Sequence, residues 1–462
     1  MLDFEDIRQF HLGAAPMWSR LIDRLGWTKC IDEHVQRDQC KLSVGTRIKA
    51  LLVNIGTDRK ALYEVEKFYG KQDMEVVLGP GIAADDLNDD ALARSLDILF
   101  ESDAQALYTK IALSTVQSLN VLHQFDDFIP VHADTTSVSV FGDYPDHRNF
   151  EIVRGYSKDH RPDLKQIIFG TATLKGLPIY GKVDRGNMDD HTWNHNTIAQ
   201  MAGLVSQEVH GQVIYIADAA AVTESNLDSF HETNTHFISR LPATFSECEK
   251  LKRAAWDKED ASAAAEAFVR THKRVMHRLQ TSLEPVETRE KRSRRGRPRK
   301  DEAVPDVVTQ YRVAIEILPP IDETLEAWRQ REATFVLMTD IRDEQRLPDE
   351  AVLRLYKEQG EVEGRFRHLK SPYHVGPIFL HRPERVHAFG YVMLLSLLLY
   401  SVFEYIIREK MAKETEPLIL SGGRKSFRPT GNSLLDMFDD IFTAHVMVNG
   451  EWHRLKTKPR DL

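Results

Sequence analysis

The feature that most constrains the fold is a change of sequence pattern at Phe128, where helical periodicity is replaced by segments of alternating polarity that are rich in β-branched residues. Strand-like runs follow at 129–142, 166–173, 178–183, 212–218 and 235–242, and helical patterns lie at 192–209 and 223–232. The order is therefore three strands, a helix, a strand, a helix and a strand. This order predicts an α/β domain built around a mixed sheet.

The pattern is interrupted by a charged, Ala-rich insertion at 243–332, which contains one strand-like run at 309–318. A further strand-like run at 334–341 and a helix at 353–370 come after it. We therefore predict a ribonuclease-H-like, mixed-sheet catalytic domain interrupted by an insertion before that helix, with a helical N-terminal domain. The predicted boundaries are 1–125 for the N-terminal domain, 126–242 and 333–410 for the sheet domain, 243–332 for the insertion and 411–462 for the tail.

Charge and composition limit the partners that the chain can have. The formal net charge is −9, from 61 basic and 70 acidic residues, so a surface that binds nucleic acid must be local. The three cysteines form no Cys-x-x-Cys pair, which is typical of a reducing cytoplasm. The longest apolar run, 388–403, is shorter than the roughly 20 residues that a bilayer needs. We expect it to be a buried core helix and expect no membrane partner.

The first 125 residues carry helical spacing, and Ser43 is a predicted N-cap for a helix that runs through Ile55. No sharp signature of a helix-turn-helix is present. DNA binding and dimerisation both stay open as roles for this region.

Three carboxylates stand out by position. Asp134 lies in the first strand, Asp218 ends the fourth, and Glu363 lies on the helix at 353–370. An acidic residue inside a β-branched strand is costly unless it is paired or binds a metal. Three carboxylates at one end of a sheet suit two hard divalent cations about 3.5–4 Å apart, which serve phosphoryl transfer. Taken singly, Asp134 can close a turn and Asp218 can cap the next helix.

The helix at 353–370 has two stripes. Tyr356, Glu363 and Lys370 are spaced seven apart and are predicted to share one face. A neighbouring apolar stripe for packing consists of Leu355, Val362, Phe366 and Leu369.

These residues resemble the signature Tyr-x2-Arg-x3-Glu-x6-Lys of DDE transposases of the bacterial insertion-sequence type. Tyr356, Glu363 and Lys370 match it, whereas Gln359 stands where the pattern has Arg. The resemblance implies that Tyr356, Lys370 and the residue at position 359 contact the DNA end. Arg365 and Arg367 are the candidates to supply the missing charge.

Three further blocks carry the same resemblance, which covers about residues 129–402. ADTTSVSVFG is similar to the strand with the first Asp and assigns Asp134, and HRPDLKQ (160–166) is similar to the block after it. ADAAAVTESNL (217–227) is similar to the second-Asp block and assigns Asp218.

The resemblance implies that Asp134, Asp218 and Glu363 bind two Mg²⁺ ions, with Mn²⁺ as an alternative, and that DNA is the substrate. It implies a bacterial cytoplasmic enzyme that cuts at the terminal inverted repeats of an insertion sequence and joins the freed 3′-OH ends to target DNA, as a homodimer in the synaptic complex. Two alternatives remain: a metal-dependent nuclease without strand transfer, and a non-catalytic DNA-binding protein derived from a transposase.

Two basic segments are candidates for DNA contact besides the helix at 353–370. The first lies close to the Asp134 strand and consists of Lys158, His160, Arg161 and Lys165. The second, KRSRRGRPRK (291–300), resembles an AT-hook through Arg295, Arg297 and Arg299 around Gly296 and Pro298. A charge-balanced surface loop and a solvated linker are the respective alternatives.

Overall fold

The computed structural model describes residues 6–37, 41–145, 148–206, 212–245, 248, 277–289, 307–320, 335–370, 378 and 380–455. The chain divides into two units. The first comprises Met1–Arg240 with Met338–Leu462, and the second comprises Leu241–Leu337.

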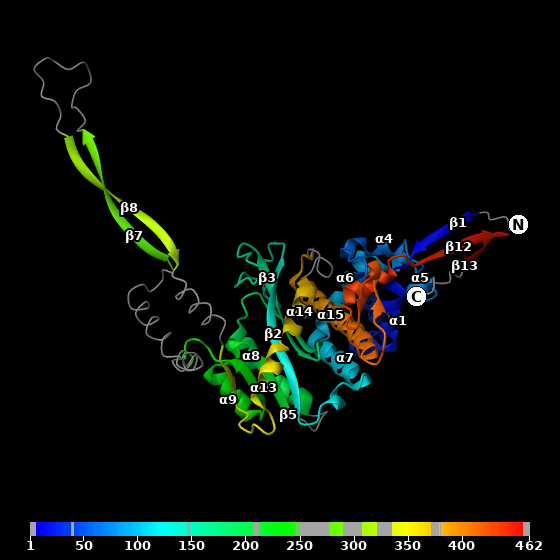
Figure 1. Cartoon of the computed structure of the whole chain (residues 1–462). Coiled ribbons are helices and arrows are strands. Elements are labelled where there is room, and N and C mark those ends of the chain that lie inside the picture. The colour runs from blue at the N-terminus through cyan, green and yellow to red at the C-terminus, as the bar shows by residue number, and fades with distance from the viewer. Residues whose placement is uncertain are drawn as a thin grey trace, which may run out of the picture. The chain divides into compact units, whose positions relative to one another are not determined.

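A six-stranded mixed sheet lies at the centre of the first unit, in the order β4-β3-β2-β5-β6-β9. Its strands are β2 (Phe128–Val140), β3 (Lys165–Leu174), β4 (Leu177–Arg185), β5 (Gln212–Ala217), β6 (His236–Arg240) and β9 (Leu337–Thr339). β2, β3 and β4 form an antiparallel meander, and β5 and β6 add to β2 in parallel. This is the ribonuclease-H arrangement, so the predicted fold class is confirmed (Figure 1).

Local chemistry explains why these strands turn where they do. Lys175 and Gly176 both have positive φ, +49° and +72°, as a two-residue hairpin between β3 and β4 requires. After β4 the chain enters α8 (Asp190–Ser206), and after β5 it enters α9 (Glu224–Glu232). Thr223 caps α9 by accepting a hydrogen bond from Asn226 N. The strands and helices predicted between 129 and 242 are therefore present, with shifts of a few residues at their ends.

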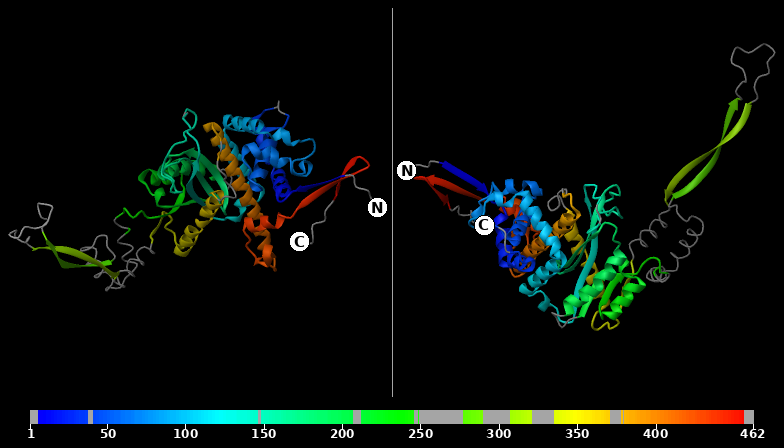
Figure 2. Two further views of the ribbon diagram at one scale, coloured as in Figure 1. Left: turned by 90° about the horizontal axis from the view of Figure 1, so that it is seen from above. Right: turned by 180° about the vertical axis from the view of Figure 1, so that it is seen from behind.

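The long apolar helix α15 (Pro383–Met411) packs against β4 on one side and against N-terminal helices α3 (Val44–Gly56) and α6 (Asp89–Glu101) on the other (Figures 1 and 2). Among the described residues it is the one helix long and apolar enough to cross a membrane, and 89% of its apolar window is buried inside the protein. It is the core helix that the sequence predicted. Ser43 caps α3 as expected, by accepting from Thr46 N.

The first unit contains further helices, of which α7 is the longest of this group. They are α1 (Ala15–Arg24), α2 (Trp27–Val35), α4 (Val65–Tyr69), α5 (Met74–Val77), α7 (Ala104–Ser118) and α16 (Gly431–Leu435). A two-stranded sheet joins β10 (Leu418–Ile419) to β11 (Lys425–Ser426).

The expected single helix at 353–370 is wrong, because the structure has two helices there: α13 (Asp349–Lys357) and α14 (Gly360–Lys370). Around Gln359 the hydrogen bonds change to the i−3 type, as in Val362 N to Gln359 O at 3.0 Å. Gly360 has a low helix propensity, which favours a break at this point. The apolar stripe survives the break, since Val362, Phe366 and Leu369 are buried. Tyr356 and Glu363 therefore reach the same region from separate helices.

A second sheet, which the sequence did not predict, joins the two ends of the chain. It has the order β1 (Asp6–His11), β12 (Phe442–Val448) and β13 (Glu451–Leu455), all antiparallel (Figure 2). It is tied to the turn before α5 by the buried Asp73 carboxylate, which accepts hydrogen bonds from His445 Nε2 (2.7 Å) and Arg454 Nε (2.8 Å).

We expect Asp73→Asn to destabilise the protein by about 1–3 kcal/mol, because it weakens the hydrogen bonds from His445 and Arg454. The loss is limited because Arg454 is partly exposed and can bind water instead. Burial tends to raise the pKa of the Asp73 carboxyl, but hydrogen bonds from Arg454 and His445 outweigh burial and hold the pKa below its ordinary 3.8. The stabilisation is thus fully present above pH 3.8 and is lost as the pH falls through the lower, folded-state pKa.

Thermal unfolding at neutral pH and at pH 3 measures this effect. The difference in unfolding midpoint between wild type and Asp73→Asn should be smaller at pH 3 than at neutral pH. Glu75→Gln is the control, since Glu75 is exposed and Arg454 keeps its bonds to Asp73. Equal midpoints for wild type and Asp73→Asn at neutral pH would contradict the prediction.

The second unit contains an antiparallel pair, β7 (His277–Arg289) and β8 (Val307–Pro320). β8 confirms the strand predicted at 309–318, whereas β7 was not predicted. The AT-hook-like segment at 291–300, with Arg295, Arg297 and Arg299, lies outside the described residues.

Candidate active site

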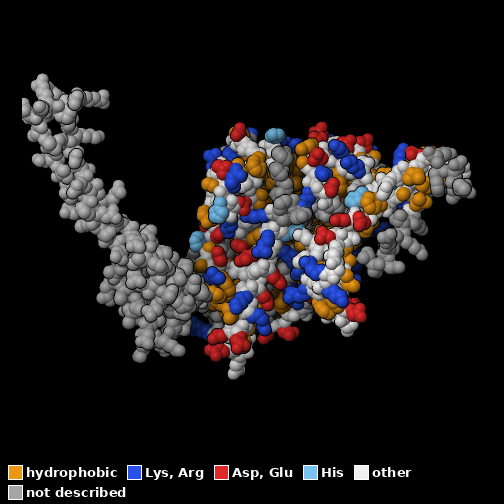
Figure 3. Space-filling view, turned by 45° about the horizontal axis from the view of Figure 1, so that its top comes forward, with side chains coloured by type: hydrophobic (Ala, Val, Ile, Leu, Met, Phe, Trp, Pro, Cys, Tyr) orange, Lys and Arg blue, Asp and Glu red, His pale blue; other side chains and the backbone are white. Residues whose placement is uncertain are grey.

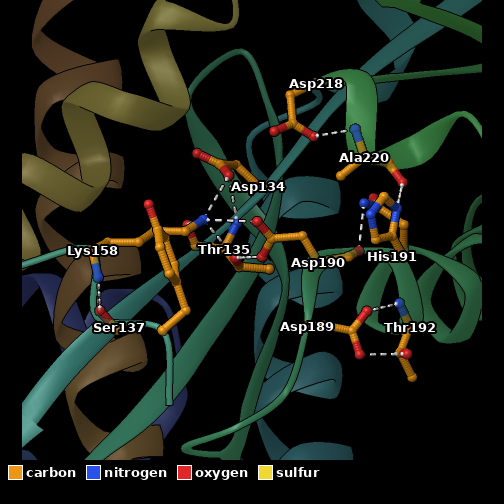
Figure 4. Close-up of polar contacts among 12 residues, drawn as sticks. Asp134, Thr135, Ser137, Lys158, Asp189, Asp190, His191, Thr192, Asp218 and Ala220 are labelled. Carbon is orange, nitrogen blue, oxygen red and sulfur yellow. Dashed lines mark hydrogen bonds and ion pairs between the residues drawn. The ribbon is translucent and has the colours of Figure 1, made fainter. Parts of the chain in front are cut away.

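Asp134 and Asp218 occupy equivalent positions on neighbouring parallel strands. The last registered pair of β2 and β5 is His132 with Ile216, and each Asp lies two residues further along. Neighbouring strands are about 4.8 Å apart, so this register brings the two carboxylates to one end of β5. Figure 4 shows both side chains there, and the charge of Asp218 acts on Asp134.

Asp134 lies in an environment that disfavours its charge. Burial raises the pKa of the carboxyl to about 6, Lys158 and the Thr135 N–H act against that rise, and the charges of Asp218 and Asp190 add to it. The Thr135 N–H donates to Asp134 Oδ1 at 2.7 Å. A partly buried group of three carboxylates thus holds excess negative charge, which a cation would relieve.

One protein cation already lies in this group (Figure 4). Lys158 Nζ is 3.2 Å from Asp190 Oδ2 and 3.7 Å from Asp134 Oδ1. It also donates to the carbonyl and hydroxyl oxygens of Thr135, both at 2.9 Å. The Thr135 hydroxyl in turn donates to Asp190. Lys158, expected to contact phosphate, therefore lies beside Asp134 and partly neutralises it.

Tyr356 is a phenol on which the charges of both Asp218 and Glu363 act. Its side chain is buried, and the Arg240 guanidinium lies over its ring, 5.5 Å from the centroid. Burial raises the pKa of the Tyr356 phenol, Arg240 lowers it, and the charges of Asp218 and Glu363 raise it. Tyr356 thus lies within electrostatic reach of both carboxylates.

Helix α14 presents Glu363 to solvent and rests on β2, β3 and α15 with its other face. Its last residue, Lys370, forms an ion pair with Asp159 at 2.5 Å. Asp159 directly follows Lys158, so this pair ties the end of the Glu363 helix to the loop that reaches Asp134. Lys370 therefore lies near the site with its ammonium already paired.

The placement of Arg365 speaks against the expected contact with DNA. Its side chain is buried, donates from Nε to Gly176 O at 2.8 Å and forms an ion pair with Glu404 at 2.6 Å. A guanidinium engaged in this way inside the protein cannot replace the Arg that the signature has at position 359. Gln359 itself is half-buried at the break between α13 and α14.

The other predicted contacts differ in their surroundings. His160 and Arg367 are exposed. Arg161 is exposed and forms a two-pronged pair with Asp163, at 2.8 and 2.7 Å. Lys165 donates to the carbonyl oxygens of Asp143 and Tyr144. None of these four is joined to the carboxylates by a contact among the described residues.

Two side chains at the site were not predicted from the sequence. Asp190 begins α8, and Arg240 ends β6. Arg240 offered a weak signal, because it ends a strand neighbouring the one with Asp218, where sites form in open α/β sheets. Asp190 offered none, since only the packing of α8 brings it to Thr135.

The donor set suits a hard divalent cation, because it consists of carboxylate oxygens. Within the part of the chain that the structure describes, no group of three or more His, Cys, Asp or Glu side chains is arranged to hold a metal ion. The register of β2 and β5 brings Asp134 and Asp218 together, whereas Glu363 lies on α14 and is not joined to either of them by a contact among the described residues.

Basic and acidic side chains are mixed on the face of the protein that Figure 3 draws. Lys and Arg are interspersed there with Asp and Glu over the described residues, and the whole chain has a net charge of −9. Specific contacts near the carboxylates are therefore more informative than overall charge.

Comparison with known proteins adds a family. Residues 131–399 match the family model described as "Transposase DDE domain", and residues 9–113 match one described as "Domain of unknown function (DUF4277)". No curated protein matches the sequence.

Two solved structures show weak likeness. The piggyBac transposase synaptic complex with hairpin DNA has a TM-score of 0.40 at 9% identity, over 92% of this chain and 79% of that one. The Mos1 transposase paired-end complex with left transposon end has a TM-score of 0.18 at 9% identity, over 49% of this chain and 71% of that one. At these scores, neither adds to what the family model shows.

Proposed function

The chain belongs to the DDE transposase family, and from this premise we propose that it cuts DNA at the terminal inverted repeats of its own element and joins the freed 3′-OH ends to target DNA. The observation that carries the proposal is the register of β2 and β5, which sets Asp134 beside Asp218. Both belong to the blocks that the family resemblance assigned. The charges of Asp218 and Glu363 both raise the pKa of the Tyr356 phenol, which supports the assignment of Glu363 as the third carboxylate of the site.

Members of this family generally use divalent metal ions. We assign Asp134, Asp218 and Glu363 as the residues that would hold them, with Mg²⁺ as the ion, two ions per site, and Mn²⁺ as an alternative. Bound ions would neutralise the scissile phosphate and activate the attacking hydroxyl. Hard carboxylate oxygens on two adjacent strands and a facing helix are the donors that such ions prefer.

The remaining side chains position DNA and neutralise its charge. Lys158 holds Asp134 and Asp190 in place and lies where a phosphate approaching Asp134 would meet an ammonium. The Arg240 guanidinium lies over the ring of Tyr356, and we assign to Arg240 the phosphate contact for which the family pattern has Arg at position 359. Lys370, Arg367, His160, Arg161 and Lys165 are proposed as outer contacts to the DNA end.

The parts outside the sheet domain also have proposed roles. We assign the N-terminal domain (1–125) to end binding or dimerisation, and the insertion (243–332), with Arg295, Arg297 and Arg299, to further DNA contact. The acting form is a homodimer on two DNA ends, in a bacterial cytoplasm.

A direct test combines the protein with linear DNA that carries the element's terminal inverted repeats and a target plasmid. With Mg²⁺, we expect nicks or breaks at the repeat ends and joined products, and none with EDTA. Cleavage without joined products would favour a nuclease. Binding without any cut, unaffected by Mg²⁺, would leave a DNA-binding protein and sink the proposal.

The role of Arg240 has its own test. We expect Arg240→Ala to weaken binding of the end DNA about tenfold, which corresponds to the loss of roughly one charge-assisted hydrogen bond. The slope of the logarithm of the binding constant against the logarithm of salt concentration should fall by about one counterion. Electrophoretic mobility shifts at several salt concentrations measure both. Arg424→Ala is the control, because Arg424 is also exposed but lies in the tail after α15. Unchanged affinity in Arg240→Ala would refute this contact.

A further inference from the structure

A buried ion pair anchors the helix that carries Glu363. Arg365 on α14 pairs through Nη1 with Glu404 Oε2 on α15 at 2.6 Å, and the two side chains are only 10% and 6% exposed. The same guanidinium donates from Nε to Gly176 O, in the β3–β4 turn, at 2.8 Å. One planar group is therefore fixed in two directions at once.

Glu404 extends the anchor to the C-terminal part of the chain. Its second oxygen, Oε1, accepts from Gly431 N at 3.0 Å and pairs with Arg408 at 2.9 Å. Gly431 begins α16. A single carboxylate thus joins α14, α15 and α16, while Arg365 adds the hairpin turn.

The anchor and Glu363 lie on opposite faces of α14. Two residues along a helix correspond to about 200°, and Arg365 is buried whereas Glu363 is exposed. A rotation of the helix by about 20° moves a side-chain tip at roughly 5 Å radius by about 2 Å. Functional groups must be held within about 0.5 Å of their working geometry, so an anchor on the buried face controls the ligand on the other.

We propose that the Arg365–Glu404 pair is a positioning device that sets the Glu363 carboxylate against Asp134 and Asp218. The inference rests on the proposed role of Glu363 as a metal ligand. Stability alone does not explain the pair, because apolar side chains of similar size often replace buried ion pairs without loss. The two hydrogen-bonding directions of the Arg365 guanidinium add defined constraints on the rotation and height of α14 to those of its apolar packing.

The test measures Mn²⁺ affinity by electron paramagnetic resonance, without DNA or turnover. We expect Arg365→Met to weaken Mn²⁺ binding about 10- to 100-fold, the range seen when residues that orient metal ligands are removed. Arg385→Met is the matched control: it removes a comparable two-pronged pair, with Asp97 at 2.8 and 2.7 Å, between α15 and α6. Its Mn²⁺ affinity should stay within about twofold of wild type.

The double variant Arg365→Met/Glu404→Met separates positioning from stability. We expect it to recover much of the unfolding midpoint lost in Arg365→Met, because no charge is left buried alone, and to keep weak Mn²⁺ binding. Arg365→Lys, which keeps the charge but not the fork, should bind Mn²⁺ with intermediate affinity. Wild-type Mn²⁺ affinity in the folded single or double variant overturns the inference.

Glu363→Gln distinguishes this failure from a failure of the proposed function. If Glu363→Gln weakens Mn²⁺ binding and folded Arg365→Met does not, the positioning role falls and the ligand assignment stands. If Glu363→Gln binds Mn²⁺ as wild type does, the ligand assignment is wrong, and the positioning role falls with it.

Discussion

Asp134→Asn is expected to reduce cleavage of the end DNA by about three orders of magnitude or more, because it removes the charge of a proposed metal ligand. The change is isosteric, and the amide oxygen can still accept from Thr135 N. Lys158 keeps its bonds to Thr135 and its pair with Asp190. The fold should therefore survive, and single-turnover cleavage of labelled DNA with Mg²⁺ measures the loss.

Asp189→Asn is the control for that experiment. Asp189 is a neighbouring exposed carboxylate, but it turns away from Asp134 to accept from Thr192 N and Oγ1 (Figure 4). The cleavage rate of Asp189→Asn should stay within about twofold of wild type, because Asp189 bonds to Thr192 and not to the carboxylates of the proposed site. Cleavage by folded Asp134→Asn at the wild-type rate would remove Asp134 from the catalytic assignment.

The largest expected effect on stability comes from Gly170→Ala in the middle of β3. A Cβ at this position would lie 2.0 Å from Cε2 and Nε1 of Trp193, whose side chain on α8 is 1% exposed. Either the strand or the indole must move in a close-packed interior. We expect a loss of about 3 kcal/mol or more, at the upper end of overpacking costs, measured as a lower thermal midpoint.

Gly364→Ala, at a position inside a helix, is expected to stabilise the protein. A Cβ there meets no atom within 4 Å, and the residue lies inside α14. The substitution should raise stability by about 0.5–1 kcal/mol by restricting the unfolded chain. If Gly170→Ala melted at the wild-type temperature, the tight contact of β3 with α8 would not be a constraint on the fold.

The sequence was informative where periodicity is strong. Alternation in 129–142 and the turn at Lys175 and Gly176 identify β2 and the β3–β4 hairpin, and a long apolar run identifies α15. Asp134 could be named because an acidic residue within a β-branched strand is unusual, Asp218 because it comes directly after a strand, and both because the family pattern covers them.

The rest depends on contacts between distant positions. The break at Gln359 and Gly360 has only a weak local signal, since single glycines occur inside helices. Arg365 looked like a surface cation because its partner, Glu404, lies on another helix and cannot be paired with it from spacing. Asp190 and Arg240 reach the site only through the packing of α8 and β6. β1 was missed for the same reason, as its partner β12 lies at the opposite end of the chain.

The pairing of β1 with β12 has a consequence during synthesis. β1 ends at His11, and β12 begins at Phe442. At a synthesis rate of roughly 5–20 residues per second, β1 leaves the ribosome on the order of 20–90 s before its partner strand exists. Glu404 and Gly431 are also synthesised after Glu363. The contacts of Arg365 with Glu404 and of Glu404 with Gly431 can therefore form only after the residues of α14 have been made.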